Sequence, residues 1–238
     1  MNNKKHSKKP KTKSLSIAPF FDGDITAMLA KIDTSDLFAL RSDTLQALPY
    51  SGEEAAKIAK ITSGEIWLGS RATLDDFVKK ASDYQILHLS THGIADDKVG
   101  DYAYLAFGNP NNQNEYEKLF IRDIYNIPLN TDMVVLSACK TAYGKLQKGE
   151  GIISMARAFA YSGAKSIITS HWSVDDKSTS IIMEDFYKGL AKGMSKDKAL
   201  RIAKLNYLKK NKGLRAHPFY WAAFIGIGDM SKIDYLSN

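Results

Sequence analysis

The sequence predicts an α/β domain: a three-layer sandwich in which helices flank a mostly parallel central sheet. Short apolar runs of strand length alternate with amphipathic segments of helix length along most of the chain. The run at residues 132–139 is nearly all apolar in its middle, which is typical of a strand buried on both faces. A chain of 238 residues is also long enough to bury a core without help from disulfides or metal ions.

The elements follow from these runs in chain order. The expected strands are residues 15–19, 65–68, 84–91, 102–107, 132–139, 165–170 and 221–227. The expected helices are residues 51–62, 73–81, 152–161, 175–190 and 195–210. Ser51 is expected to cap the first helix and Gly64 to end it. Residues 94–118 are polar around one short strand, and so long a loop inside a compact domain is usually functional.

The positive charge is concentrated at the N-terminus. The net charge is +7, and residues 1–14 hold six lysines and no acid, which leaves a net charge of +1 for the rest. We therefore expect a basic flexible tail or linker at 1–14 and one globular domain at 15–238. The sequence does not favour nucleic-acid binding except through the lysine-rich tail. No apolar run approaches the roughly 20 residues that span a bilayer, so no membrane partner is expected.

Two reactive side chains follow strands that parallel pairing would bring to one sheet edge, where ligands collect. His92 follows the strand at 84–91, and Cys139 ends the strand at 132–139 and lies 47 residues later. An imidazole within reach can take the proton of a thiol whose ordinary pKa is about 8.5. Gly93 can turn its amide toward an oxyanion. The alternative is that Cys139 is a core residue and His92 a structural polar group, and the pattern alone leaves both open.

Longer stretches of sequence resemble a known family. They are ILHLSTHG at 86–93, VVLSAC and its continuation at 134–176, HPFYWAAFIGIGD at 217–229 and LPYSGEEAAKI at 48–58. Together they resemble the CHAT domain family of the caspase–separase clan, whose members are cysteine peptidases often joined to tetratricopeptide repeats. The resemblance implies that His92 is the catalytic histidine and Cys139 the nucleophile. The amides of Gly93 and Cys139 would then form the oxyanion hole.

A substrate pocket is a further expectation. Residues 172–176 resemble a separase segment whose acid recognises a basic side chain, and Asp176 is the matching position. His171, at the end of its own strand, could line the same pocket. The alternative is that Asp175 or Asp176 caps the following helix. His88 would share a strand face with His92, but without a third ligand the pair is a poor metal site.

The resulting hypothesis is a caspase-like cysteine endopeptidase, a hydrolase that cleaves a protein substrate after a basic residue. No cofactor or metal is expected. The resemblance also implies a bacterial cytoplasmic setting and a regulatory module of the tetratricopeptide type, either upstream or on a separate chain. The alternative function is a catalytically silent caspase-fold module that regulates, or is regulated by, a partner protein.

Overall fold

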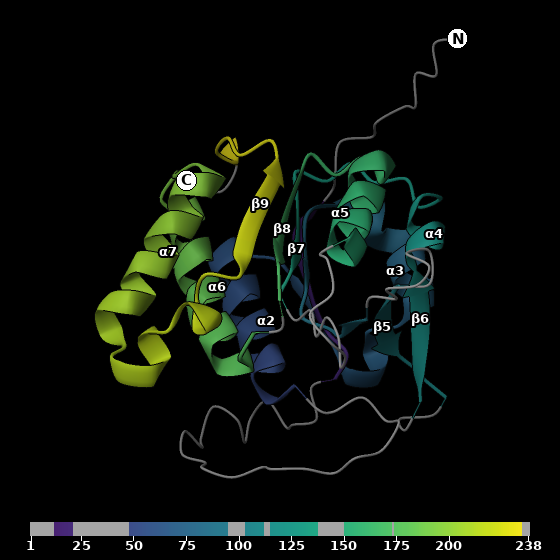
Figure 1. Ribbon diagram of the computed structural model, residues 1–238. Coiled ribbons are helices and arrows are strands. Elements are labelled where there is room, and N and C mark those ends of the chain that lie inside the picture. Colours follow the sequence, from purple (N-terminus) through teal and green to yellow (C-terminus); the bar gives the residue numbers. More distant parts are fainter. Residues whose placement is uncertain are drawn as a thin grey trace.

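The computed structural model describes residues 12–20, 48–94, 103–111, 115–137, 150–172 and 174–234. Its central feature is a six-stranded sheet with helices on both faces (Figure 1). The strand order is β2-β1-β3-β7-β8-β9, and every neighbouring pair is parallel except β8–β9. The strands are β1 Thr12–Ala18, β2 Glu65–Leu68, β3 Tyr84–Leu89, β7 Met133–Leu136, β8 Ser166–Ser170 and β9 Phe224–Gly228. The three-layer α/β prediction is therefore confirmed.

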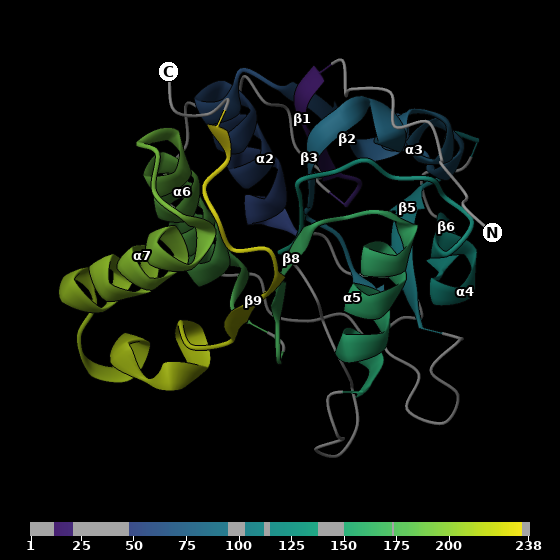
Figure 2. The same ribbon diagram turned by 90° about the horizontal axis from the view of Figure 1, so that it is seen from above.

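Different helices cover the two faces of this sheet, as Figure 2 shows from above. One face carries α2 Pro49–Thr62, α6 Asp176–Ala191 and α7 Lys196–Lys210. The opposite face carries α3 Leu74–Lys80, α4 Ile121–Ile124, α5 Glu150–Ser162 and a small second sheet. Short 3₁₀ turns complete the described elements: η1 Gly69–Arg71, η2 Ala81–Asp83, η4 Gly213–Ala216 and η5 Pro218–Tyr220. Each face buries its own apolar cluster.

Alternation along the central strands explains why both faces are apolar. In β3, Leu87 and Leu89 join the cluster beneath α3 and α5, whereas Ile86 joins the cluster beneath α6 and α7. In β7, Val134 and Val135 are divided between the two faces in the same way. Successive side chains of a strand point to opposite faces, so a strand covered on both sides has to be apolar at nearly every position.

The end of α2 lies directly against β1, where the residues in contact are small. Ser14 of β1 is buried, and its hydroxyl lies 2.5 Å from the hydroxyl of Thr62 at the end of α2. A Cβ at Gly64 would lie only 1.8 Å from the Ser14 Oγ atom, so this turn accepts no larger residue. The close approach brings the polar side chains on the inner face of α2 within hydrogen-bond reach of β3.

The start of α2 differs from the prediction. The helix begins at Pro49 with Leu48 as its N-cap, and Ser51 lies in the first turn, where its hydroxyl donates to the Leu48 carbonyl. The expected cap at Ser51 was therefore wrong. Proline is well suited to the first helical position because that residue needs no N–H partner, so the helix begins two residues early.

Residues 94–118 were expected to be a polar loop around one short strand at 102–107; that strand is present, but the two strands that flank it were not predicted. A second, antiparallel sheet consists of β4 Gly93–Ile94, β5 Tyr104–Gly108 and β6 Tyr116–Phe120. Leu105, Phe107 and Leu119 bury their side chains in the cluster beneath α3 and α5. Leu119 is the one buried residue of β6, and the charged residues Glu117 and Lys118 before it conceal the strand in the sequence.

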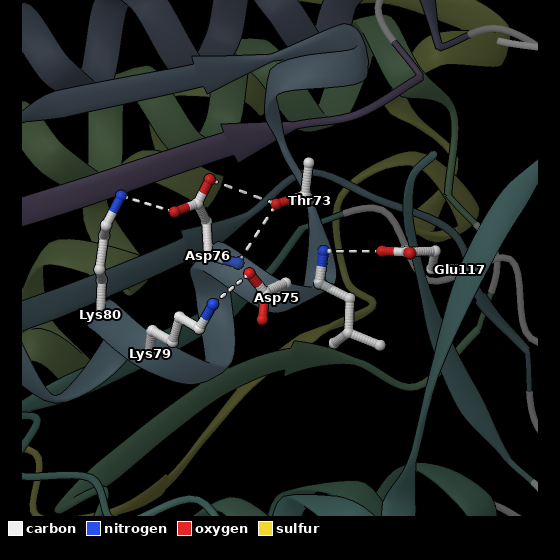
Figure 3. A network of polar contacts seen from close by, with 7 residues as sticks. Thr73, Asp75, Asp76, Lys79, Lys80 and Glu117 are labelled. Carbon is white, nitrogen blue, oxygen red and sulfur yellow. Dashed lines mark hydrogen bonds and ion pairs between the residues drawn. The ribbon is translucent and has the colours of Figure 1, made fainter. Parts of the chain in front are cut away.

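A surface network fastens α3 to this small sheet (Figure 3). Thr73 caps α3, since its hydroxyl accepts the Asp76 amide at 3.2 Å. The Glu117 carboxylate of β6 accepts the Leu74 amide at 3.1 Å. Two further ion pairs link residues one helical turn apart, Lys79–Asp75 and Lys80–Asp76. The predicted helix start at Thr73 is confirmed.

The prediction of a tail at 1–14 and a domain at 15–238 stays a prediction. Strand β1 begins at Thr12 and pairs with both β2 and β3. Residues 1–11, which hold five of the six lysines of this tail, lie outside the described residues.

Candidate active site

The candidate site lies where the neighbouring parallel strands β3, β7 and β8 end. His92 follows β3, and His171 follows β8 directly. Cys139 lies just beyond β7 but outside the described residues, as do residues 140–149. The ladder between β3 and β7 continues one residue past both strands, because the Ser137 amide donates to the Leu89 carbonyl at 3.1 Å. This sheet edge is therefore the one that the sequence predicted.

The register between β3 and β7 has a constant offset. Ile86 pairs with Met133 and Leu89 with Leu136, so each partner lies 47 residues further along the chain. His92 and Cys139 are separated by the same number of residues. His92 therefore follows the end of β3 by the same number of residues as Cys139 follows the end of β7.

His92 is buried, and its backbone is bonded to the small second sheet. Only 1% of the residue is exposed, and its carbonyl accepts the Ala106 amide of β5 at 2.9 Å. The hydroxyl of Thr91 donates to the Ala106 carbonyl. The Phe20 ring meets the imidazole edge-on, with the ring centroids 4.8 Å apart. Gly93 is buried as the first residue of β4, so the turn between the two sheets fixes both predicted residues.

Beneath His92 lies a polar cluster that the sequence did not predict as a unit. The Glu54 carboxylate of α2 lies 2.7 Å from His88 Nε2 and accepts from the Ser90 hydroxyl at 2.8 Å. Ser90 also lies 2.8 Å from the Ser137 hydroxyl, and Tyr187 of α6 lies 3.2 Å from His88 Nδ1. His88 is thus part of a hydrogen-bonded cluster. A pattern search could have flagged only that polar residues interrupt two apolar strands.

Asp175 and Asp176 have different structural roles. Asp175 is the N-cap of α6, and its carboxylate accepts the Ser178 amide at 2.9 Å. Asp176 is half-buried as the first residue of α6, and its carboxylate accepts the Tyr50 amide at the start of α2, also at 2.9 Å. The cap expected at Asp175 or Asp176 is therefore Asp175. The negative charge of Asp176 instead faces the positive end of the α2 dipole.

His171 is exposed at the end of β8, four residues before Asp175 in the sequence. The indole N–H of the next residue, Trp172, donates to the Phe219 carbonyl at 3.0 Å. A groove of about 420 Å³ lies elsewhere, between α7 and the edge strand β9, and its lining includes Leu200, Trp221 and Met230. Because β9 is separated from β3 by two strands, this groove is distinct from the candidate site.

Within the described ranges, no group of three or more His, Cys, Asp or Glu side chains is arranged to hold a metal ion. In the same part of the chain, no helix has the length and apolar character needed to cross a membrane.

Comparisons with solved structures show the fold. A complex of the pro- and mature domains of Porphyromonas gingivalis RgpB matches 94% of this chain and 50% of its own, with a TM-score of 0.51. The Arg specific cysteine proteinase gingipain R matches 96% of this chain and 50% of its own, with a TM-score of 0.52. Sequence identity is 11% in both cases, so these similarities show a caspase-like fold alone.

Curated relatives include tetratricopeptide repeat protein 28 of mouse, 22% identical, and of human, 23% identical, each over 222 residues. The match covers 80% of this chain but only 9% of each relative. Their names agree with the predicted association with tetratricopeptide repeats. Both relatives are mammalian and give no support to a bacterial setting, which, like a cytoplasmic one, stays a prediction. The CHAT domain family itself matches residues 4–229, so this chain belongs to the CHAT domain family.

Proposed function

We propose that this chain is a cysteine endopeptidase that works through His92 and Cys139. The observation that carries the proposal is the register of the central sheet. The β3–β7 pairing has an offset of 47 residues, and the same offset separates His92 from Cys139. Because the carboxyl ends of neighbouring parallel strands lie side by side, residues that follow β3 and β7 at the same offset are expected to meet at one sheet edge. That is the arrangement a thiol–imidazole dyad needs.

The chemistry assigns one role to each group. His92 takes the proton of the Cys139 thiol, and the thiolate attacks the carbonyl carbon of the scissile peptide bond. The amides of Gly93 and Cys139 donate to the oxyanion that forms. His92 then gives its proton to the leaving amine as the C–N bond breaks. A water molecule finally hydrolyses the thioester, which restores the free thiol and releases a carboxylic acid.

We further propose a preference for Arg or Lys before the cleaved bond, recognised by Asp176 with His171 beside it. A carboxylate binds a guanidinium or ammonium group through charge-assisted hydrogen bonds. The half-buried position of Asp176, at the start of the helix that follows β8, supports this role. The gingipain R structure is that of an Arg specific proteinase of the same fold, which agrees with the preference. The hydrogen bond from Tyr50 to Asp176 gives the same carboxylate a structural role as well.

The second candidate function is a silent caspase-fold module that acts on a partner protein. The burial of His92 favours it, because a catalytic imidazole has to reach the substrate and this one is 1% exposed. In the endopeptidase proposal the same burial describes a resting state, and a regulatory module of the tetratricopeptide type opens the site. The relatives named as tetratricopeptide repeat proteins support a module of that kind.

Labelling by peptidyl acyloxymethyl ketones tests the proposal. Probes with Arg, Lys, Leu or Asp beside the reactive group are incubated with the protein, alone and together with a tetratricopeptide partner, and adducts are detected by intact mass. We expect one adduct, on Cys139, which is lost in Cys139→Ala and in His92→Ala and is strongest with Arg or Lys. Absence of any adduct, with and without a tetratricopeptide partner, while iodoacetamide still labels Cys139, would favour the silent module.

Asp176→Asn and Asp175→Asn form a matched pair for the specificity. Both variants remove one charge at the start of α6, but only Asp176 is proposed to meet the substrate. We expect Asp176→Asn to lose the preference for Arg and Lys probes over Leu, and Asp175→Asn to keep it. If both variants prefer Arg and Lys probes over Leu to the same degree, Asp176 does not recognise the substrate. The dyad proposal would not be affected.

A further inference from the structure

The polar cluster beneath His92 joins four elements at their buried sides. Glu54 comes from α2, His88 and Ser90 from β3 and the residue after it, Ser137 from the end of β7, and Tyr187 from α6. Each of the five is at most 1% exposed. Polar groups so deeply buried are costly unless they are hydrogen-bonded, and here each has a partner within the cluster.

A donor and an acceptor can be assigned to each hydrogen bond of this cluster. Glu54, as a carboxylate, only accepts, so both the Ser90 hydroxyl and His88 Nε2–H donate to its Oε1 atom. The single proton of Ser90 is then used, so the Ser137 hydroxyl donates to Ser90 Oγ. In a neutral imidazole Nδ1 is the acceptor, and Tyr187 donates to it. The hydrogen bonds thus run from Ser137 and from Tyr187 toward the carboxylate of Glu54.

The bond between Ser90 and Ser137 occupies a special place in the sheet. β3 ends at Leu89 and β7 at Leu136, so these serines are the first residues after the two strands. They lie at the same 47-residue offset, and their hydroxyls are 2.8 Å apart. Where the ladder of strand pairs ends, a side-chain hydrogen bond continues to hold the two chains together. Each serine stands two residues before a proposed catalytic residue, His92 or Cys139.

We propose that the chain of hydrogen bonds Glu54–Ser90–Ser137, oriented by His88, holds together the ends of β3 and β7, the strands that precede His92 and Cys139, and so positions the dyad. Ser90, Ser137, Glu54 and His88 are then positioning residues, since they act through the dyad. The inference rests on the proposed function. It adds that α2, through Glu54, anchors both ends of the dyad.

Packing alone does not require these polar groups. On β1, Ser16 is buried on the same face as Ser14 and pairs in register with His88, yet among the described residues its hydroxyl has no hydrogen-bond partner. A serine beneath α2 can therefore be buried without joining the cluster. Ser90 and Ser137 differ from Ser16 because they bond to each other across two strand ends. Ser16 provides a matched control for them.

The experiment follows the alkylation of Cys139 by iodoacetamide as a function of pH. Cys139 is the single cysteine of the chain, so intact mass reports one site. In the wild type we expect reaction well below the ordinary thiol pKa of about 8.5, since a paired imidazole favours the thiolate. Ser90→Ala and Ser137→Ala should move the midpoint toward that of His92→Ala and slow alkylation near neutral pH by about tenfold, because displacements of about 1 Å are costly at such sites.

Each result decides a different question. A wild-type profile in both serine variants, with a shifted profile in His92→Ala, would overturn the positioning role and leave the dyad intact. An unchanged profile in His92→Ala would overturn the dyad and the positioning role together. Shifted serine variants without labelling by any peptidyl probe would retain the positioning role and overturn the endopeptidase. Ser16→Ala should match the wild type, and a shift there equal to that of Ser137→Ala would show a general packing effect instead.

Discussion

Two polar networks of this protein lie in opposite surroundings. The network at α3 (Figure 3) consists of Thr73, Asp75, Asp76, Lys79, Lys80 and Glu117 and lies at the surface, where the Lys79 and Asp75 side chains are 65% and 72% exposed. The side chains of His88 and Glu54 in the buried cluster are 0% and 1% exposed. Water can replace any contact of the surface network, whereas nothing replaces a lost partner in the interior.

The networks also differ in how far they reach along the chain. At α3, most partners are three or four residues apart, and one bond, from Leu74 to Glu117, reaches another element. In the buried cluster, hydrogen bonds join residues that are 34, 36, 47 and 99 positions apart in the chain. The one local contact is between His88 and Ser90. A surface network therefore stabilises one helix, whereas the buried cluster determines how four elements meet.

The largest expected effect is at Glu54. Glu54→Leu removes the acceptor of both the Ser90 hydroxyl and His88 Nε2–H and leaves two buried donors without a partner. We expect the free energy of unfolding to fall by about 3 kcal/mol, because breaking a buried polar pair costs that order of energy. Equilibrium unfolding in urea measures it.

Glu54→Gln is the matched control, since it keeps an acceptor oxygen and loses only the charge. We expect a loss of about 1 kcal/mol, the difference between a charge-assisted and a neutral hydrogen bond. Equal losses of unfolding free energy in the two variants would show that the acceptor oxygen of residue 54 does not stabilise the fold. The buried network would then be no more important for stability than the exposed one.

The next effect is at Thr73, where the surface network has its one capping residue. Thr73→Ala removes the side chain that accepts the Asp76 amide at the start of α3. We expect a loss of about 1 kcal/mol in the free energy of unfolding, as is usual for an N-cap. Thr73→Ser, which keeps the hydroxyl, should recover most of it, and urea unfolding of both variants is the measurement. A loss in Thr73→Ala as large as that in Glu54→Leu would contradict the ranking of the two networks.

This contrast also explains what the sequence could predict. Local features such as the Thr73 cap and the α6 start at Asp175 and Asp176 follow from neighbouring residues, and the structure has them. The strands follow from apolar runs, and their parallel pairing follows from the helices between them. The strand ends at His92 and beyond β7 were predicted for the same reason. The partners of His88 were not, because a hydrogen bond to Glu54 depends on how closely α2 approaches β3.

Two errors have different origins. The helix at 51–62 was started at Ser51 because its capping side chain is visible in the sequence, whereas the fit of Pro49 at the first helical position decided the start. The strands β4 and β6 were missed because their buried faces, such as Leu119 of β6, are short and interrupted by charges. The first error is a choice between two local signals, whereas the second depends on pairing with β5 and packing beneath α3.

The smallest expected effect concerns the charge on Asp76. A hydrogen bond from Lys80 holds the pKa of the Asp76 carboxyl below its ordinary value of 3.8. A carboxyl whose pKa is lowered on folding contributes stability above its unfolded value, and the contribution is lost as the pH falls through the folded value. Lys80→Met keeps the apolar stem that lies near Trp67 but removes the donor. We expect the NMR titration midpoint of Asp76 to rise toward its ordinary value in this variant.

Lys79→Met is the control for that titration, since Lys79 bonds to Asp75 and influences Asp76 only through its charge. It should raise the midpoint of Asp76 less than Lys80→Met does. The small stability difference between Lys80→Met and the wild type should be present at neutral pH and vanish once Asp76 is protonated. A difference that persists in acid would mean that Lys80 stabilises α3 through its contact with Trp67, and the surface network would then depend on packing, as the buried one does.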